Sequence, residues 1–288
     1  MPELPEVETV VRGLQTVLPG RRILKVRLGK TDFIEDPAAL ERDLPGRRIN
    51  GVRRHGKFLV VELGRSHKDS ATLSLLIHLG MTGQILVCPP DARIAPHTHV
   101  FLGLDDGREF RYVDIRRFGK MRLLANGSPE TSLQKLGSDP LEISQEQFSA
   151  LIHSRHARIK ALLLDQSVLR GMGNIYTDES LWRARIHPAR RGSSLKPDGL
   201  RRLYQAVRDV LIEAIRLRGS SVSDYVDSEG RPGEFQLRHR VYQRTGKTCF
   251  RCGAVVRRSV VAGRSSHYCP RCQPAPRAKG PGRRRRLR

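Results

Sequence analysis

The chain has 288 residues, of which 38% are hydrophobic, and this length suits two ordinary domains with a sizeable core. No stretch approaches the ~20 apolar residues of a membrane span, and the acidic, proline-containing N-terminus excludes a signal peptide, so we expect a cytoplasmic protein without a membrane partner. The formal net charge is +24, and +17 remains without the seven basic residues from Arg277 onward. A charge this large indicates a polyanionic partner, with nucleic acid as the commonest.

The chain begins with the sequence MPELPE. Prolines and acidic residues suit the first turn of a helix, and apolar residues continue at helical spacing. Pro2 has a second interpretation, because removal of Met1 would leave it with a free secondary amine, and an α-amino group has a pKa of roughly 8. Such an amine can attack a sugar aldehyde carbon and form an iminium ion, while Glu3 supplies or removes a proton.

Up to about residue 125, the chain alternates apolar and polar residues as strands do. A hairpin signal, the Asp105-Asp106-Gly107 turn, separates the last two candidates. The pattern predicts a two-layer β-domain with the first helix packed on it. The expected strands are residues 23–28, 51–63, 72–78, 84–87, 99–104 and 108–113.

A polar, turn-rich stretch around residues 127–139 is the expected linker, and the periodicity after it is helical. The expected helices are residues 145–154, 159–165, 174–184 and 200–217. A small, polar stretch at residues 219–233 is either a lid or a connector. From residue 274 the chain is rich in arginine, proline and glycine, which predicts disorder.

Four of the five cysteines form two C-x2-C pairs, Cys249 with Cys252 and Cys269 with Cys272, and Cys88 stands alone. The odd count argues against a disulfide framework. Each pair places two thiolates on one tight turn, and together they predict a tetrahedral zinc site. Four sulfur ligands leave no open position, so this one zinc ion should be structural.

Several other motifs have a plain structural interpretation beside a functional one. These are RRHGKFLVVE at 53–62, HLGMTG at 78–83, PHTH at 96–99, DIRRFG at 114–119 and GMGNIY at 171–176. Taken alone, each is more often a turn, a cap or a solvated basic residue. The two histidines of PHTH lack an evident third ligand, so we do not expect a metal there.

Together with the opening sequence MPELPEVET, the stretch 160–186 and the closing stretch GRSSHYCPRCQ at 263–273, these motifs resemble the formamidopyrimidine-DNA glycosylase family, in the expected order from Pro2 to Gln273. The resemblance implies an α+β protein, in which an N-terminal β-sandwich domain with an N-terminal helix precedes a helix-two-turns-helix domain and a C-terminal zinc finger. It also implies base-excision repair of oxidised purines such as 8-oxoguanine, and cutting of abasic sites by β,δ-elimination. We expect duplex DNA in a basic cleft and a monomeric protein.

The resemblance also implies roles for single residues. Pro2 is the nucleophile and Glu3 handles protons. Lys57 contacts the lesion phosphate and helps β-elimination, and Arg264 contacts the damaged-site phosphate and assists the second elimination.

The remaining implied roles concern DNA contacts. His97 contacts DNA, and Lys160 and Asn174 hold the phosphates beside the lesion. Three further residues fill the gap that an extruded base leaves, with the arginine pairing with the orphaned cytosine. They are Met81, Arg116 and Phe118.

The expected domains are a catalytic β-sandwich, a linker, a helical DNA-binding domain, a zinc finger and a disordered basic tail that adds nonspecific DNA affinity. Two alternatives stay open. One is an activity on oxidised pyrimidines like that of endonuclease VIII, and the other is a zinc-dependent DNA-binding protein without catalysis. The expected domain bounds are 1–126, 127–143, 144–234, 235–273 and 274–288.

Overall fold

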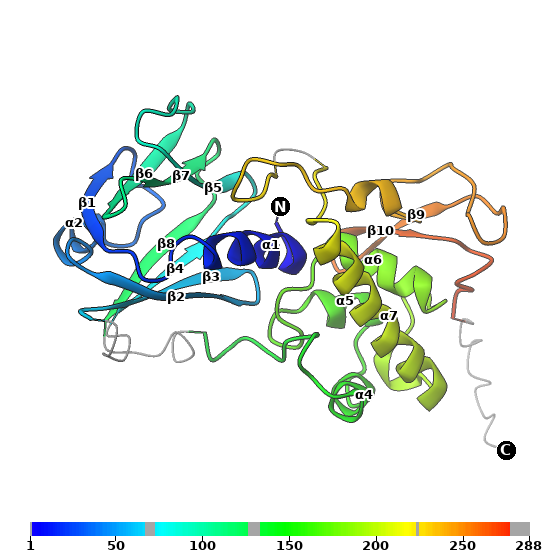
Figure 1. Ribbon diagram of the computed structural model, residues 1–288. Coiled ribbons are helices and arrows are strands. Elements are labelled where there is room, and N and C mark those ends of the chain that lie inside the picture. The colour runs from blue at the N-terminus through cyan, green and yellow to red at the C-terminus, as the bar shows by residue number, and fades with distance from the viewer. Residues whose placement is uncertain (1, 67–72, 126–132, 223–224, 277–288) are drawn as a thin grey trace, which may run out of the picture. The chain divides into compact units, whose positions relative to one another are not determined.

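The computed structural model describes residues 2–66, 73–125, 133–222 and 225–276 (Figure 1). Parts of the expected linker (127–132), of the stretch 219–233 (223–224) and of the basic tail (277–288) lie outside these residues. Contacts group the chain into two units that are not continuous in sequence, and the expected domain bounds stay predictions. Unit 1 is Met1–Ile143, Leu164–Gly173 and Arg208–Arg238, and unit 2 is Ser144–Leu163, Asn174–Val207 and His239–Arg288.

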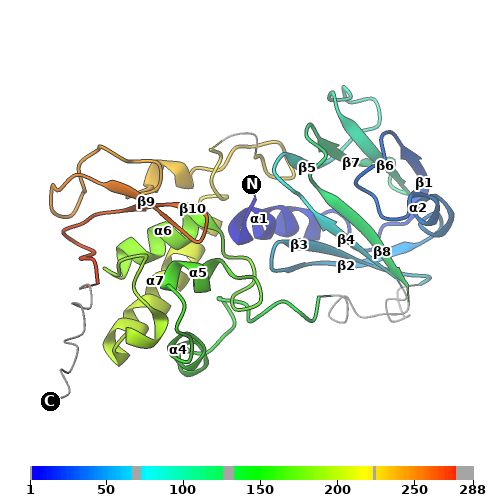
Figure 2. The same ribbon diagram turned by 180° about the vertical axis from the view of Figure 1, so that it is seen from behind.

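Unit 1 holds the predicted β-sandwich, which is built from two antiparallel four-stranded sheets (Figures 1 and 2). One sheet has the order β1-β6-β7-β5, with β1 at Ile23–Leu28, β6 at Thr98–Leu104, β7 at Glu109–Asp114 and β5 at Gly83–Cys88. The other has the order β2-β3-β4-β8, with β2 at Arg48–His55, β3 at Phe58–Gly64, β4 at Leu73–His78 and β8 at Lys120–Ala125.

The structure corrects the single expected strand at 51–63. This stretch forms the hairpin β2–β3, which turns at Gly56 and Lys57, and Gly56 has a φ of +62°. A left-handed residue in a tight turn favours glycine, and a turn of only two residues is easily overlooked between two strands. Strand β8 and helix α2 (Pro37–Asp43) were not predicted either.

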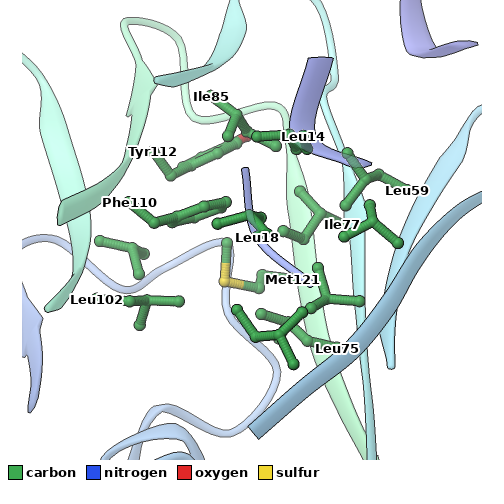
Figure 3. Close-up of a cluster of buried hydrophobic side chains, with 14 of the residues drawn as sticks. Leu14, Leu18, Leu59, Leu75, Ile77, Ile85, Leu102, Phe110, Tyr112 and Met121 are labelled. Carbon is green, nitrogen blue, oxygen red and sulfur yellow. The ribbon is translucent and has the colours of Figure 1, made fainter. Parts of the chain in front are cut away.

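The core of unit 1 lies between the two sheets and helix α1 (Leu4–Gln15) (Figure 3). Helix α1 buries Leu4, Val7, Val10, Val11 and Leu14, in line with the apolar periodicity of the sequence. Burial of this face fixes the direction of α1 and therefore the place of the residues before it. The cluster includes Leu14, Leu59, Ile77, Ile85, Phe110 and Tyr112 from α1 and both sheets.

Unit 2 carries the predicted helices and the cysteine-rich hairpin. Helix α4 begins after Ser144, whose hydroxyl accepts a hydrogen bond from the Gln147 amide. Helix α7 passes from unit 2 into unit 1, where the short η2 helix (Phe235–Arg238) follows. The other elements of unit 2 are α4 (Gln145–His153), α5 (Ile159–Leu164), α6 (Asn174–Arg183), η1 (Gly192–Ser194), the start of α7 (Pro197–Arg216), β9 (Arg257–Val261) and β10 (Arg264–Tyr268).

Among the helices described here, none combines the length and the apolar character needed to cross a membrane.

Candidate active site and nucleic-acid interface

Pro2 and Glu3 are both buried where α1 begins. The Leu4 amide donates a hydrogen bond to the Gly171 carbonyl oxygen at 3.0 Å, which holds the start of the helix against residues 171–173. The carboxyl group of Glu3 packs against Gly173, where an added Cβ would lie 2.2 Å from Glu3 Cδ. A side chain at residue 173 would therefore displace the Glu3 carboxyl group from its present position.

Lys57 lies in the β2–β3 turn and is 9% exposed. The turn packs close to residues 170–171, because a Cβ at Gly56 would lie 3.1 Å from Arg170 Cβ and 3.5 Å from the Gly171 nitrogen. The structure thus brings the turn that carries Lys57 and the segment that carries Pro2 to the same neighbour, Gly171.

The charge of Lys57 acts on His78, at the end of β4. Burial, and then the positive charges of Lys57 and Lys120, lower the pKa of His78 to about 4. His78 Nδ1 accepts a hydrogen bond from the Gly80 amide at 3.1 Å, as expected of a neutral imidazole. This part of the site therefore keeps a neutral histidine beside an ammonium group.

An ion-pair network supports the β2–β3 hairpin. The Arg54 guanidinium group contacts Glu8 at 2.8 Å and Asp139 at 2.7 Å, so strand β2 is joined to helix α1 and to the expected linker. Removing one partner of such a buried pair leaves an uncompensated charge. The sequence motif had shown Arg54 only as part of a basic loop.

Two loops bring Met81, Arg116 and Phe118 together. Arg116 Nη1 lies 3.4 Å from Met81 Sδ, and the Arg116 guanidinium carbon lies 4.4 Å from the centroid of the Phe118 ring. All three side chains are exposed, with Met81 at 38% and Phe118 at 54%. Exposed apolar side chains next to a planar cation suit insertion between stacked bases.

The side chain of Asp114 holds these two loops in place through hydrogen bonds. Its fully buried carboxylate accepts hydrogen bonds from the Thr82 hydroxyl at 2.5 Å, the Tyr112 hydroxyl at 3.2 Å and the Gly119 amide at 2.9 Å. Burial, and then the charge of Asp114, raise the pKa of Tyr112, so its hydroxyl keeps the proton that it donates. The motif DIRRFG contained this aspartate, but its contact with Thr82 arises only in the fold.

His97 is exposed and has a φ of +63°. The loop before it is held by the buried Arg111 guanidinium group, which donates to the carbonyl oxygens of Pro90 at 2.9 Å and Ala92 at 2.8 Å. The Asp114 amide donates to the His97 carbonyl oxygen at 3.0 Å. The fold therefore presents His97 on a fixed backbone.

Unit 2 carries Lys160, which is fully buried at the start of α5. Its ammonium group donates to Asp178 Oδ1 and to the Ser265 carbonyl oxygen, both at 2.6 Å. The second Asp178 oxygen accepts from the His267 amide at 2.8 Å. Lys160 and Asp178 thus tie the hairpin β9–β10 to helices α5 and α6.

Arg264 and Asn174 occupy different surroundings in unit 2. Arg264 is exposed at the start of β10, one residue before the Ser265 carbonyl group that Lys160 holds. Asn174 is the first residue of α6, and its buried Oδ1 atom has no hydrogen-bond partner among the described residues. The free backbone amides and the dipole at a helix start suit an anionic group, toward which only the amide nitrogen of the Asn174 side chain could donate a hydrogen bond.

The four cysteine sulfur atoms lie within 4.8 Å of one another. The Cys249–Cys272 and Cys252–Cys269 sulfur distances are 4.0 Å and 3.4 Å. A tetrahedral zinc ion with Zn–S bonds of about 2.3 Å needs sulfur atoms about 3.8 Å apart. The cluster therefore fits one metal ion with four sulfur ligands, the set that zinc prefers.

Three family models match the chain. The formamidopyrimidine-DNA glycosylase N-terminal domain matches residues 1–121, the H2TH domain of the same glycosylase matches residues 136–226, and the zinc finger found in FPG and IleRS matches residues 246–275.

Relatives match over nearly the whole length. The chain is 46% identical to a formamidopyrimidine-DNA glycosylase of Solibacter usitatus, covering 95% of this chain and 99% of the relative, and 42% identical to one of Pelotomaculum thermopropionicum with the same coverage. Among solved structures, it is similar to Lactococcus lactis Fpg in complex with abasic-site DNA, with 33% identity, a TM-score of 0.85 and coverage of 95% and 100%. A MutM complex with DNA containing carbocyclic 8-oxo-G gives the same four values.

The fold, the cysteine cluster and these matches define a zinc-finger enzyme of DNA base-excision repair. The chain belongs to the formamidopyrimidine-DNA glycosylase family, whose members are bifunctional enzymes that combine a glycosylase with a lyase for abasic sites. The family and the fold class that the sequence motifs predicted are confirmed.

Proposed function

We propose that this enzyme removes oxidised purines, 8-oxoguanine and formamidopyrimidines, from duplex DNA and then cuts the abasic site by β,δ-elimination through Pro2. The observation that carries the proposal is the buried pair Pro2–Glu3, which the Leu4–Gly171 hydrogen bond and the Glu3–Gly173 contact hold at the start of α1. Once Met1 is removed, Pro2 would carry an amine in a fixed position, which suits nucleophilic attack because its approach to the sugar is set in advance.

In the first step, the damaged nucleotide is extruded and the Pro2 nitrogen attacks the sugar C1′ atom. A bond forms between this nitrogen and C1′, while the bond from C1′ to the base breaks. The base leaves with the electron pair of that bond and takes up a proton. Glu3 is the group that delivers and removes protons, because its carboxyl group is adjacent in the chain and buried.

The Pro2 nitrogen then loses its proton, the C1′–O4′ bond breaks and O4′ takes up a proton, which opens the sugar ring and leaves an iminium ion between Pro2 and C1′. This ion withdraws electrons from C2′. Loss of a C2′ proton then breaks the bond from C3′ to its phosphate oxygen, and loss of a further proton from C4′ breaks the bond from C5′ to its phosphate oxygen. Both phosphates leave with their electron pairs. We propose that Lys57 assists the first elimination and Arg264 the second by contacting these phosphates.

The DNA contacts divide by their chemistry. His97 and Asn174 contact the DNA backbone, which positions the duplex without reading its sequence. Lys160 serves the same interface through Ser265 and Asp178, because its ammonium group is buried against them. Met81 and Phe118 fill the gap in the base stack, and Arg116 pairs with the orphaned cytosine.

The four cysteines would hold one zinc ion, which supplies no chemistry and fixes the hairpin β9–β10. The enzyme acts as a monomer in the cytoplasm, where its large positive charge draws it to DNA.

The test is reduction with borohydride in the presence of a duplex that contains an abasic site. We expect wild-type protein to form a covalent adduct that Pro2→Gly loses and that Pro5→Ala, a control in the same helix, retains. The intact mass of the protein must show that Met1 has been removed, because a retained methionine converts the amine of Pro2 into an amide. A correctly trimmed protein without any adduct would leave only a DNA-binding role.

Substrate choice needs a separate comparison. We expect faster excision from duplexes with 8-oxoguanine opposite cytosine than from duplexes with thymine glycol. A relative, Lactococcus lactis Fpg, has been solved with DNA that contains an oxidised pyrimidine, so both lesions belong in the assay. The reverse order of rates would assign this enzyme to oxidised pyrimidines.

A further inference from the structure

The Glu6 carboxylate connects two distant parts of unit 1. It is 2% exposed, and each oxygen accepts a hydrogen bond from a different backbone amide. Oε2 accepts from the Glu3 amide at 2.8 Å, and Oε1 accepts from the Ser220 amide at 2.7 Å, which lies 214 positions away in the chain. One buried side chain therefore holds both the residue next to Pro2 and the start of a glycine-rich segment.

The described part of this segment, residues 219–222 and 225–235, contacts α1 at two further points. The Tyr225 hydroxyl lies 3.3 Å from the Glu6 carbonyl oxygen, to which it donates. Further along, Ser228 fills the space beside Gly13, because an added Cβ there would lie 2.0 Å from Ser228 Oγ. The Phe235 amide donates to the Gly219 carbonyl oxygen at 2.9 Å, so the two ends of the segment meet.

Hydrogen bonds to a buried carboxylate are strong, and they fix the plane of that carboxylate. If the segment moves away from α1, the Ser220 amide leaves Oε1, and the carboxylate loses one of the donors that fix this plane. The Glu3 amide then loses part of its constraint. Because Glu3 follows Pro2 directly, the direction of the attacking nitrogen changes with it.

We propose that Glu6 is a positioning residue that couples the seating of residues 219–222 and 225–235 on α1 to the alignment of the Pro2 nitrogen. The inference rests on the proposed role of Pro2 as nucleophile. With the segment seated, Pro2 is aligned for attack. With the segment displaced, Pro2 is misaligned although it is chemically intact.

Two glycines of the segment provide a matched test. Gly219 has a φ of +78° and Gly230 a φ of +80°, so alanine is strained to the same degree at both. A Cβ at Gly219 would lie 2.8 Å from Glu6 Oε1, whereas a Cβ at Gly230 would meet nothing within 4 Å. Gly219→Ala therefore disturbs the Glu6 carboxylate, and Gly230→Ala adds the same strain without that contact.

Excision is measured in single turnovers with saturating enzyme, alongside DNA affinity. We expect Gly219→Ala to slow the chemical step about 10- to 100-fold, with DNA affinity close to that of the wild type, because small misplacements of a reacting group cost rate. Gly230→Ala should keep the wild-type rate. Glu6→Gln should slow the same step, because its amide group cannot accept from both donors. The double variant Gly219→Ala/Glu6→Gln should be no slower than the slower of these two single variants, because both changes act through the same carboxylate.

Hydrogen exchange on the full-length protein without DNA gives a second readout. The amides of Glu3 and Ser220 should exchange faster in Gly219→Ala and Glu6→Gln than in the wild type. Their exchange rates in Gly230→Ala should equal those of the wild type. Equal rates for the two alanine variants in a protein whose wild type forms the borohydride adduct would overturn the coupling. An inactive wild type with the expected exchange pattern would instead overturn the proposed function.

Discussion

Gly173 lies against the carboxyl group of Glu3 so closely that an added Cβ would be 2.2 Å from Glu3 Cδ and 2.3 Å from Oε1. Glu3 is buried and its backbone amide is bound to Glu6, so a side chain at residue 173 would have to move the Glu3 carboxyl group within a packed environment. The conformation of the glycine does not explain its presence, since its φ lies outside the left-handed region. Glycine at this position is explained by the space that the Glu3 side chain occupies.

We therefore expect Gly173→Ala to displace the Glu3 carboxyl group and to slow base excision about 100-fold. Single-turnover kinetics on an 8-oxoguanine duplex measure this rate. Gly199→Ala, in the first turn of α7, is the control, because a Cβ added there would lie 4.0 Å from its nearest neighbours. A wild-type rate in Gly173→Ala would mean that the position of Glu3 does not limit excision.

A second prediction concerns Asp114, which joins the loops of Met81 and Phe118. In Asp114→Asn, an NH2 group replaces one carboxylate oxygen and cannot accept hydrogen bonds from the hydroxyl groups and the backbone amide around it. Each hydrogen bond lost in this way costs about 1.5–3 kcal/mol. We expect excision opposite cytosine to slow about tenfold by the loss of loop alignment.

The comparison for this variant is Asp106→Asn, the same change in the β6–β7 turn, where the aspartate pairs with the partly exposed Arg108. Melting temperatures of both variants separate lost stability from lost alignment. If Asp114→Asn excises at the wild-type rate, the two loops do not need this anchor.

The cysteine cluster lies next to a tryptophan whose fluorescence can be measured. Trp182 is the only tryptophan of the chain, and its Nε1 atom lies 3.4 Å from Cys249 Sγ. We expect a chelator to change the tryptophan fluorescence at the same rate as zinc is released, because the hairpin loses its metal-dependent structure. DNA affinity should fall in parallel.

The variants for this prediction are Cys269→Ser, which should bind no zinc, and Cys88→Ser, which should keep one ion per chain. Cys88 lies on β5, outside the cluster. Metal-free protein with undiminished DNA affinity would show that the hairpin does not contribute to binding.

A fourth prediction follows from His78. Its pKa of about 4 lies below the ordinary value of about 6.5 that applies to the unfolded chain. Between these values the unfolded state binds more protons, so stability is complete above about pH 6.5 and falls as the pH approaches 4. The difference between the two pKa values corresponds to about 3 kcal/mol.

His78→Gln keeps an acceptor for the Gly80 amide but does not titrate. Its free energy of unfolding should therefore depend less on pH than that of the wild type between pH 7 and 4.5. Urea unfolding at several pH values measures this, with His153→Gln, an exposed position on α4, as the control. Parallel pH profiles for all three proteins would contradict a buried neutral His78.

The sequence by itself determined the family, the β-sandwich and the two cysteine pairs that the fold gathers into one cluster. Alternation and helical spacing are local patterns, and so are two C-x2-C pairs or the opening MPELPE, so they can be recognised along the chain. The hairpin β2–β3 was not recognised, because only Gly56 and Lys57 separate its two strands and the stretch was taken as one strand.

Only the tertiary structure decided which of these motifs meet. Glu6 looked like part of a helix start, and nothing local connects it with Ser220, 214 positions away. The family resemblance implied that Lys160 holds a phosphate beside the lesion, and only the fold shows that its ammonium group is buried against Asp178 and Ser265. Such contacts depend on how whole elements pack, and hydrogen bonds between distant segments leave no periodic trace in the sequence.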